Sequence, residues 1–274
     1  MYSDMGREIR TSQILSPRSG NAIVIAIDHG LFMGPISGIE DIVAAVGRVA
    51  AGGADAIQLS PGSARAARDA FKGRSAPSLI LRLDACNFWR TGPEIGSHEG
   101  YIAPVATPLD AVKVGAAAAV CFYFIGHGDD QMEQENLERI GEWAGECQEL
   151  GIPLMVEPLP INVKNENDPQ LVKLASRIAC EASADLIKTN YTGDEASFRA
   201  VVEACPVPVL LRGGPRTSSL REALEMVAGA MRAGARGVVF GRNVFQAPDL
   251  GKMIAALGKI IHEHGSVDQA LQLL

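Results

Sequence analysis

Short runs of apolar and β-branched residues alternate along the chain with longer stretches in which apolar residues recur at helical spacing. This alternation is typical of repeated strand–helix units that build a parallel sheet. Eight units fit the chain, and no GxGxxG pattern follows the first strand, so we predict a single (β/α)8 TIM barrel of class α/β rather than an open doubly wound sheet. The predicted strands are Ala22 to Asp28, Asp55 to Ser60, Ser78 to Asp84, Ala118 to Ile125, Pro153 to Leu159, Asp185 to Tyr191, Val207 to Arg212 and Gly237 to Gly241.

Capping residues mark the expected helix boundaries. A serine or threonine three residues before an acidic residue predicts a helix start, and this spacing occurs at Ser37, Thr107, Thr192 and Ser219. Asp168 is followed by proline, which the first turn of a helix tolerates. Glycines after Ala51, Leu150 and Ala233 predict helix ends.

Nothing in the composition divides the 274 residues into separate domains. We expect one TIM-barrel domain, residues 1–274, in which residues 1–20 form an N-terminal extension covering the barrel. The segment from Cys86 to Pro104 interrupts the pattern and predicts a long loop after the third strand, on the face where barrels carry their sites. The sequence leaves open whether this loop closes over the site or packs against a neighbouring subunit.

The composition indicates which classes of function the chain is suited to and which it is not. A hydrophobic content of 47% and 29 glycines suit a large core with many tight turns. The net charge of −7 argues against a nucleic-acid partner. No apolar stretch approaches the roughly 20 residues that span a bilayer, and the polar start MYSDMGREIR is unlike a signal peptide, so we expect a cytoplasmic protein without a membrane partner.

Histidine and cysteine spacings do not predict a metal site or a disulfide framework. The five cysteines are an odd number without a CxxC pair, and the five histidines lack ligand spacing. Most of the histidines are expected on the surface or in loops, and His262 and His264 at the frayed end of the last helix. Only His29, next to Asp28, remains a candidate for substrate binding.

Lys188 is the strongest candidate for chemistry. If Leu186 points into the barrel, Lys188 does too, near the carboxyl end of the sixth predicted strand, where barrels place their sites. Burial among apolar neighbours lowers the pKa of an amine and favours the neutral, nucleophilic form. Asp28 is inward by the same rule and is a candidate proton acceptor. Alternatively, Lys188 forms a structural ion pair and Asp28 caps a turn.

Three further charged residues lie at expected lumen positions. Arg82 and Asp84 end the third predicted strand, and Glu157 lies in the fifth. They are candidates for proton transfer or hydroxyl binding, or alternatively Arg82 and Asp84 form a buried pair on the barrel floor.

Glycine and arginine follow the last two predicted strands. Arg212, Gly213 and Gly214 follow the seventh, and Gly241 and Arg242 follow the eighth. Barrels commonly bind phosphate at these two loops, through backbone N–H groups, and an arginine adds a charged fork. The alternative is ordinary turn glycine beside a solvated arginine.

Four segments together resemble the archaeal-type, DeoC-like class I aldolases. This family includes metal-free fructose-bisphosphate aldolases, amino-dideoxy-heptulosonate synthases and the thiolase acting on phosphorylated autoinducer-2. The resemblance implies that Lys188 is the Schiff-base lysine, that Asp28 is the aspartate of the family's DHG motif, and that the two glycine segments bind phosphate. The four segments are Ile27 to Pro35, Leu186 to Tyr191, Arg212 to Pro215 and Gly241 to Gln246.

One position departs from the family pattern. The aldolases and heptulosonate synthases carry a tyrosine acid/base before a proline on the fifth strand, where this chain has Leu159 before Pro160. Leucine transfers no proton, so Glu157 or another lumen group takes over, or the reaction differs.

The sequence and the resemblance together predict a class I aldolase that makes or breaks a carbon–carbon bond in a small phosphorylated ketone or aldehyde. We expect a covalent lysine imine and no metal or other cofactor, with Asp28 and Glu157 moving protons. The family also implies a homo-oligomer, a pentamer or decamer. Two alternatives remain: acyl transfer to coenzyme A, recognised by acetyl-CoA formation, and a non-catalytic barrel that binds sugar phosphates.

Overall fold

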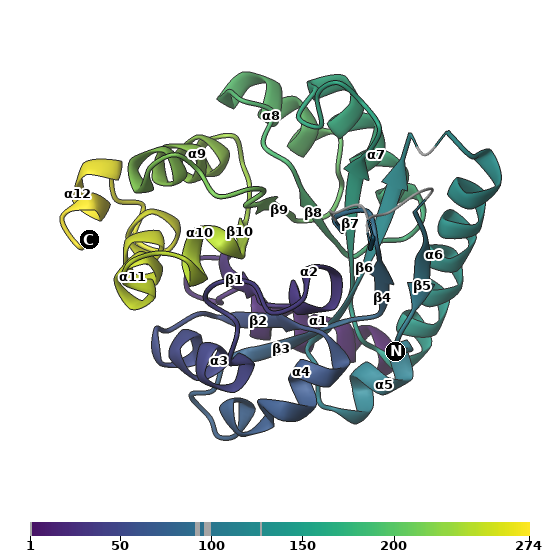
Figure 1. Ribbon diagram of the computed structural model, residues 1–274, viewed down its shortest axis with the longest axis horizontal. Coiled ribbons are helices and arrows are strands. Elements are labelled where there is room, and N and C mark those ends of the chain that lie inside the picture. The colour runs from purple at the N-terminus through teal and green to yellow at the C-terminus, as the bar shows by residue number, and fades with distance from the viewer. Residues whose placement is uncertain (1, 91–93, 96–99, 127) are drawn as a thin grey trace.

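Eight parallel strands close into a barrel surrounded by helices, as the alternating pattern predicted (Figure 1). The computed structural model describes residues 2–90, 94–95, 100–126 and 128–274. Around the barrel the strands follow the order β1-β10-β9-β8-β7-β6-β3-β2, and all eight predicted strands are confirmed. Their bounds are β1 (Ala22–Ala26), β2 (Ala56–Leu59), β3 (Ser78–Arg82), β6 (Ala118–Ile125), β7 (Leu154–Pro160), β8 (Leu186–Thr189), β9 (Val209–Arg212) and β10 (Gly237–Phe240).

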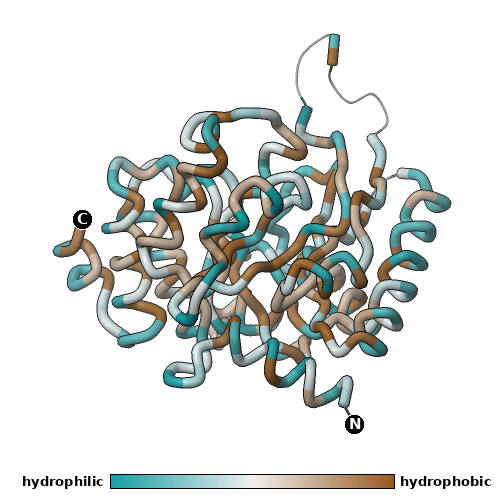
Figure 2. The backbone as a smooth tube through the Cα atoms, turned by 90° about the horizontal axis from the view of Figure 1, so that it is seen from below, coloured by the Kyte–Doolittle hydropathy of each residue, from teal (hydrophilic) through white to brown (hydrophobic). Residues whose placement is uncertain are grey.

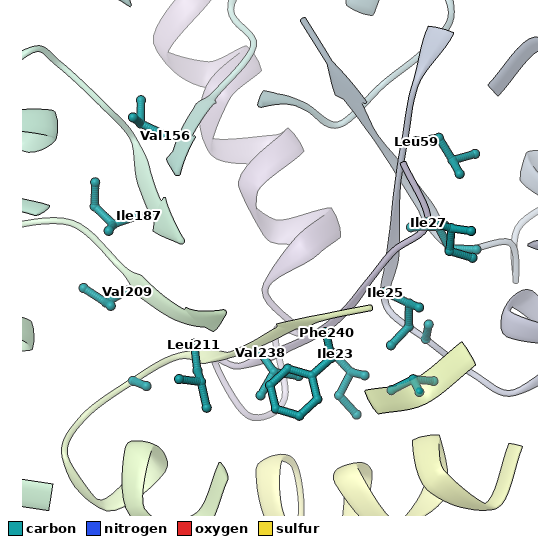
Figure 3. Packing of buried hydrophobic residues seen from close by; sticks show 14 of the residues in the cluster. Ile23, Ile25, Ile27, Leu59, Val156, Ile187, Val209, Leu211, Val238 and Phe240 are labelled. Atoms are coloured by element: carbon teal, nitrogen blue, oxygen red, sulfur yellow. The ribbon is translucent and has the colours of Figure 1, made fainter. Parts of the chain in front are cut away.

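Each strand is buried on both faces, which explains why the strands read as continuous apolar runs. Ile23 and Ile25 of β1 point outward, toward the helix layer, with Val238 and Phe240 of β10 (Figure 3). Val24 belongs to a second apolar cluster that fills the lumen. In Figure 2 the hydrophobic stretches run through the middle of the molecule and hydrophilic residues are frequent on the outer coils.

Most of the helices form the outer ring (Figure 1). None of those described is both long and apolar enough to cross a membrane. Their bounds are α1 (Tyr2–Ile14), α2 (Gly30–Met33), α3 (Ile42–Ala51), α4 (Pro61–Ala66), α5 (Pro108–Lys113), α6 (Asp130–Leu150), α7 (Pro169–Glu181), α8 (Glu195–Glu203), α9 (Leu220–Arg232), α10 (Arg242–Phe245), α11 (Leu250–Ile261) and α12 (Val267–Leu271), with a 3-10 turn at Arg68–Phe71.

Helix α1 is attached to the amino-terminal end of the barrel. Ile14 is fully buried in the lumen cluster. The guanidinium of Arg10 donates to the carbonyl of Gly151 at 2.6 Å, and that of Arg7 donates to Asp185 at 3.2 Å. Both acceptors lie just before a barrel strand, so α1 leaves the carboxyl ends of the strands free.

Three of the five predicted helix caps are confirmed, at Thr107, Asp168 and Ser219. The other two were wrong: Asp41 caps α3 in place of Ser37, and Asp194 caps α8 in place of Thr192. In each case an aspartate closer to the first helical turn accepts a backbone N–H at N3. Aspartate is at least as good a cap as serine or threonine, so the nearer residue sets the boundary.

The predicted long loop after the third strand contains regular structure at its two ends. Strands β4 (Asp84–Cys86) and β5 (Ile102–Pro104) pair antiparallel, so the prediction of a plain loop was wrong there. An alternating apolar pattern is absent from such short strands, which left no periodic signal. Residues 91–93, 96–99 (with His98) and 127 lie outside the described residues.

Gly237, at the start of β10, is required by the closure of the barrel. Its φ is +120°, and an added Cβ would lie 1.9 Å from the carbonyl oxygen of Ala22 on β1. We therefore expect Gly237→Ala to lower the free energy of unfolding by about 3 kcal/mol, through backbone strain and the clash. Gly47→Ala is the matched control, because this helical glycine has open space around it and alanine favours a helix.

Urea unfolding followed by circular dichroism measures both variants. A Gly237→Ala protein as stable as the wild type would contradict the register of β10 against β1.

Candidate active site

A pocket opens at the carboxyl ends of the barrel strands, the end opposite α1. Ten predicted site residues line it together. They are Asp28, His29, Arg82, Glu157, Lys188, Arg212, Gly213, Gly214, Gly241 and Arg242, and they share the wall with Ala26, Phe32, Met33, Trp89, Phe122 and Val239. Only Asp84 of the predicted set lies outside the pocket wall.

Lys188 projects into the lumen from β8, as its register with Leu186 predicted. Only 4% of the residue is exposed, and its Nζ donates to Glu157 at 2.8 Å and to the side-chain oxygen of Gln58 at 3.4 Å. Burial lowers the pKa of Lys188 below its usual value, although attraction to Glu157 acts in the opposite direction. The amine is therefore easier to deprotonate than an exposed lysine.

Glu157, on the adjacent strand β7, is surrounded by three cations. Its carboxylate accepts hydrogen bonds from Arg82 at 2.7 Å, Lys188 at 2.8 Å and Arg212 at 2.9 Å. Burial favours the neutral acid, but the attraction of the three cations outweighs it and holds the pKa of Glu157 well below its usual value. A proton placed on Glu157 is consequently given up readily.

Arg82 connects the carboxylates beneath the pocket. Its guanidinium donates to Asp28 at 2.9 Å, to Glu157 at 2.7 Å and to Asp84 at 3.4 Å. Its Cζ also lies 3.8 Å from the ring centroid of Phe122. These contacts fix the planar guanidinium on both its edge and its face.

Asp84 contacts Arg82 from outside the pocket wall. It is fully buried, and besides Arg82 it accepts the backbone N–H of Phe122 at 2.8 Å. Burial raises the pKa of Asp84 to about 7. Arg82 and Asp84 therefore form a buried pair, and Arg82 also contacts the lumen carboxylates of Asp28 and Glu157. Both arrangements that the sequence left open as alternatives are present.

Asp28 is linked to Lys188 by Gln58, a residue that the sequence reasoning missed. The amide of Gln58 donates to Asp28 at 2.6 Å, and its oxygen accepts from Lys188. Burial opposes the charged form of Asp28, yet Arg82 and Lys188 together keep the pKa of Asp28 below its usual value. The available signal was register, since Gln58 shares the inward face of β2 with Ala56.

The loops after β9 and β10 form the cationic side of the pocket. Arg242 begins α10 and donates from Nη2 to the carbonyl of Gly214 at 3.1 Å, whereas its buried Nε has no hydrogen-bond partner. Burial and the nearby Arg212 both lower the pKa of Arg242. Among the described residues no carboxylate pairs with Arg242, so this side of the pocket favours an anion.

Asn243, a second residue missed from sequence, shapes these loops. Its amide donates to the carbonyls of Gly213 at 3.0 Å and Pro215 at 3.3 Å, and its oxygen accepts the N–H of Thr217 at 2.9 Å. The loop after β9 is therefore attached to α10 by side-chain hydrogen bonds.

His29 lies against the same loops. Its ring contacts Phe245 edge-on at 5.2 Å, and a Cβ on Gly241 would lie 2.4 Å from its Cε1, so glycine is needed there. Burial lowers the pKa of His29 to about 4, which leaves the ring neutral near pH 7. Its Nδ1 is buried and has no hydrogen-bond partner.

The other described histidines and the cysteines do not line the pocket. His262 hydrogen-bonds Asp55 at 3.0 Å and Ser19 at 2.8 Å, near the amino-terminal end of the barrel, and is not part of a frayed helix end. His127 falls outside the described residues. All five cysteines are free thiols. In the described part of the chain, no group of three or more His, Cys, Asp or Glu side chains could hold a metal ion.

Comparison with known proteins identifies relatives along the whole chain. Residues 22–247 match the model of the DeoC/LacD family aldolases. An uncharacterized aldolase of Saccharolobus solfataricus is 40% identical over 98% of this chain and 99% of the relative. A 2-amino-3,7-dideoxy-D-threo-hept-6-ulosonate synthase of Halobacterium salinarum is 33% identical over 98% and 96%. An archaeal fructose-1,6-bisphosphate aldolase, solved with its catalytic lysine covalently bound to the carbinolamine of its substrate, is 29% identical with a TM-score of 0.81, over 94% of this chain and 99% of that one.

Proposed function

This chain belongs to the DeoC/LacD family of aldolases, as its motifs predicted, and we propose that it is a class I enzyme in which Lys188 forms a Schiff base with a small phosphorylated ketone. The observation that carries the proposal is the placement of Lys188: a buried amine at the carboxyl end of a barrel strand, 2.8 Å from a carboxylate. The archaeal fructose-bisphosphate aldolase, which uses a lysine covalently, supports it by similarity.

In the first step, neutral Lys188 attacks the ketone carbon. The resulting carbinolamine loses its hydroxyl as water, for which a carboxylic acid must supply a proton. Glu157 is 2.8 Å from Nζ, which places it to transfer the amine proton to the departing hydroxyl. The product is an iminium, which draws electrons from the adjacent carbon.

In the second step, the iminium becomes an enamine when a carbon–hydrogen or carbon–carbon bond adjacent to it breaks. Glu157 or Asp28 accepts the proton released from carbon or from the substrate hydroxyl. Both carboxylates line the pocket, and Arg82 holds both in place. Glu157 thereby performs the proton transfers for which Leu159 has no group.

The substrate phosphate occupies the cationic side, at Gly213, Gly214, Gly241 and Arg242. Backbone N–H groups of glycine-containing loops at a helix start suit a phosphate. The unpartnered Nε of Arg242 supplies a donor that the protein itself leaves unused. His29, which is neutral, adds a hydrogen bond without adding charge.

We expect Arg242→Gln to raise the Kd for dihydroxyacetone phosphate about 10- to 100-fold, because a hydrogen bond to a charged group contributes about 1.5–3 kcal/mol. Weak binding of unphosphorylated dihydroxyacetone is expected to change little. Isothermal titration calorimetry measures both ligands, and the solvent-exposed Arg216→Gln serves as the control on the same loop. Equal losses for the two ligands would show that Arg242 does not read the phosphate.

Hydrogen exchange tests the function without knowledge of the second substrate. Enamine formation replaces a C3 hydrogen of dihydroxyacetone phosphate by deuterium from D2O, which NMR detects. We expect exchange with this ketone or another phosphorylated ketone, unaffected by EDTA and absent in Lys188→Ala. Exchange that EDTA abolishes would contradict the proposed class I mechanism.

A coenzyme A arm in the same assay separates carbon–carbon chemistry from acyl transfer. Release of acetyl-CoA from a phosphorylated diketone would identify the thiolase alternative, whereas the proposed aldolase gives an aldehyde. A protein that binds phosphorylated ketones but neither exchanges hydrogen nor forms product would be the non-catalytic alternative.

A further inference from the structure

Resting on the proposed function, we infer that the aldehyde joined to or released from the Lys188-bound ketone is apolar, not a second sugar phosphate. The aldehyde meets the side of the pocket that faces away from the phosphate loops, so the side chains on that side decide which aldehyde fits.

The barrel order separates two sides of the pocket. In a closed ring of eight strands, β10 lies opposite β6, and β9 lies opposite β3. The glycine loops and Arg242 follow β9 and β10, so they define the cationic side. Strand β6 and Trp89, which follows β4, define the other side, and Lys188 on β8 lies between the two sides in the ring.

Aromatic rings cover the second side. Phe122 of β6 contacts Phe32 at 5.3 Å and Trp89 at 5.3 Å, and Phe32 contacts Trp89 at 5.6 Å, all edge to face. All three line the pocket, and we call these three residues the aromatic wall. Trp89 also reaches the cationic side, where the Arg212 guanidinium lies 6.0 Å from its ring.

Leu159 packs against this apolar surface but does not line the pocket. It is 3% exposed and packs in one cluster with Phe32, Phe122 and Phe124. The position where the sequence resemblance implies a tyrosine therefore lies within apolar side chains. A hydroxyl-bearing residue is replaced by one that offers only van der Waals contact.

Among the described residues, no Ser, Thr, Asn, Gln or Tyr side chain lines the pocket beside the aromatic wall to bind the hydroxyl groups of an aldehyde. Arg82 contacts the wall, with its Cζ 3.8 Å from the ring centroid of Phe122, and each of its three nitrogens already donates one hydrogen bond to a carboxylate, of Asp28, Asp84 or Glu157. Each hydroxyl left without a partner costs about 1–3 kcal/mol. A second phosphate would meet a guanidinium neutralised by three carboxylates, so charge opposes it as well.

An apolar aldehyde can pack against the aromatic wall without losing hydrogen bonds, and it can react with the enamine. The enamine carbon forms a bond to the aldehyde carbon, the carbonyl electron pair moves to oxygen, and that oxygen takes a proton from protonated Glu157. Water then hydrolyses the iminium, releasing the hydroxyketone phosphate and regenerating the Lys188 amine. The reverse sequence releases the aldehyde.

Competition between aldehydes tests the inference. Wild-type enzyme and dihydroxyacetone phosphate, or whichever phosphorylated ketone exchanges hydrogen fastest, are mixed with butanal, benzaldehyde and D-glyceraldehyde 3-phosphate, and products are measured by mass spectrometry. We expect kcat/KM for butanal or benzaldehyde to exceed that for glyceraldehyde 3-phosphate at least tenfold. Trp89→Gln should reduce this ratio at least tenfold, whereas Trp89→Phe should retain it.

The outcomes distinguish this inference from the proposed function. Hydrogen exchange accompanied by a preference for glyceraldehyde 3-phosphate, or by no product from either apolar aldehyde, overturns the inference and leaves the Schiff-base mechanism in place. A ratio unchanged in Trp89→Gln also overturns it, because the aromatic wall would then not contact the aldehyde. Absence of exchange with every ketone overturns the proposed function, and the inference with it.

Discussion

Replacing Glu157 by glutamine is expected to lower kcat for carbon–carbon bond formation or cleavage about 100- to 10,000-fold, the range typical for loss of a general acid/base. The variant keeps the shape of the side chain but cannot exchange protons. Glutamine also removes the negative charge that stabilises the Lys188 ammonium, so the pKa of Lys188 should fall further. The amine should therefore remain nucleophilic, whereas dehydration of the carbinolamine should slow and the proton transfers of bond formation or cleavage should fail.

Product formation and imine formation are measured separately on the Glu157→Gln protein. Product formation should be lost, whereas slow borohydride trapping of the ketone on Lys188 should persist. Circular dichroism checks that Glu157→Gln is folded, since three cations lose their shared carboxylate. Activity within tenfold of the wild type would assign the proton transfers to Asp28 or to another group.

Replacing Arg82 by methionine is expected to lower the free energy of unfolding by about 3–5 kcal/mol at neutral pH, the usual effect of removing one member of a buried ion pair. Asp28, Asp84 and Glu157 would be left without the cation that contacts all three. The methionine chain fills most of the volume of the arginine stem, so the loss reports charge more than packing.

The stability deficit of Arg82→Met is expected to depend on pH. In the wild type, the pKa values of Asp28 and Glu157 lie below their usual values, so their stabilising contribution is lost as the pH falls. In Arg82→Met, Glu157 keeps Lys188 and Arg212 as partners, but Asp28 loses the guanidinium bonded to it, so burial raises the pKa of Asp28 and stability is lost as the pH rises above about 4. The deficit should therefore be largest at pH 7–8 and narrow toward pH 4.

Urea titrations at several pH values measure this deficit. Arg74→Met, an exposed arginine, is the control and should stay within about 0.5 kcal/mol of the wild type. A pH-independent deficit in Arg82→Met would indicate lost packing rather than uncompensated charge.

The sequence predicted the barrel and the charged residues of the pocket because both follow from strand register. Once Leu186 is placed inward, Lys188 must follow, and the same rule places Asp28 and Glu157 in the lumen. Two helix starts were wrong because several capping residues lie within a few positions, and the nearer aspartate prevails.

Other residues of the pocket were missed from the sequence for a different physical reason. Gln58 and Asn243 do not titrate, and only their hydrogen bonds reveal what they do. Trp89 and Phe122 resemble ordinary core residues in the sequence, because apolar side chains occur in every strand. Their grouping as a wall opposite the phosphate loops arises from closure of the barrel, which brings together segments distant along the chain.

The most direct test of the account is to identify the residue that becomes covalently bound to substrate. Wild-type protein is incubated with dihydroxyacetone phosphate and a panel of phosphorylated ketones, reduced with borohydride, and analysed by intact mass and peptide mapping. The account predicts one adduct per chain, confined to Lys188, absent in Lys188→Ala and retained in Lys164→Ala, an exposed lysine in the loop after β7. An adduct on another lysine, or no adduct with any ketone, would contradict it.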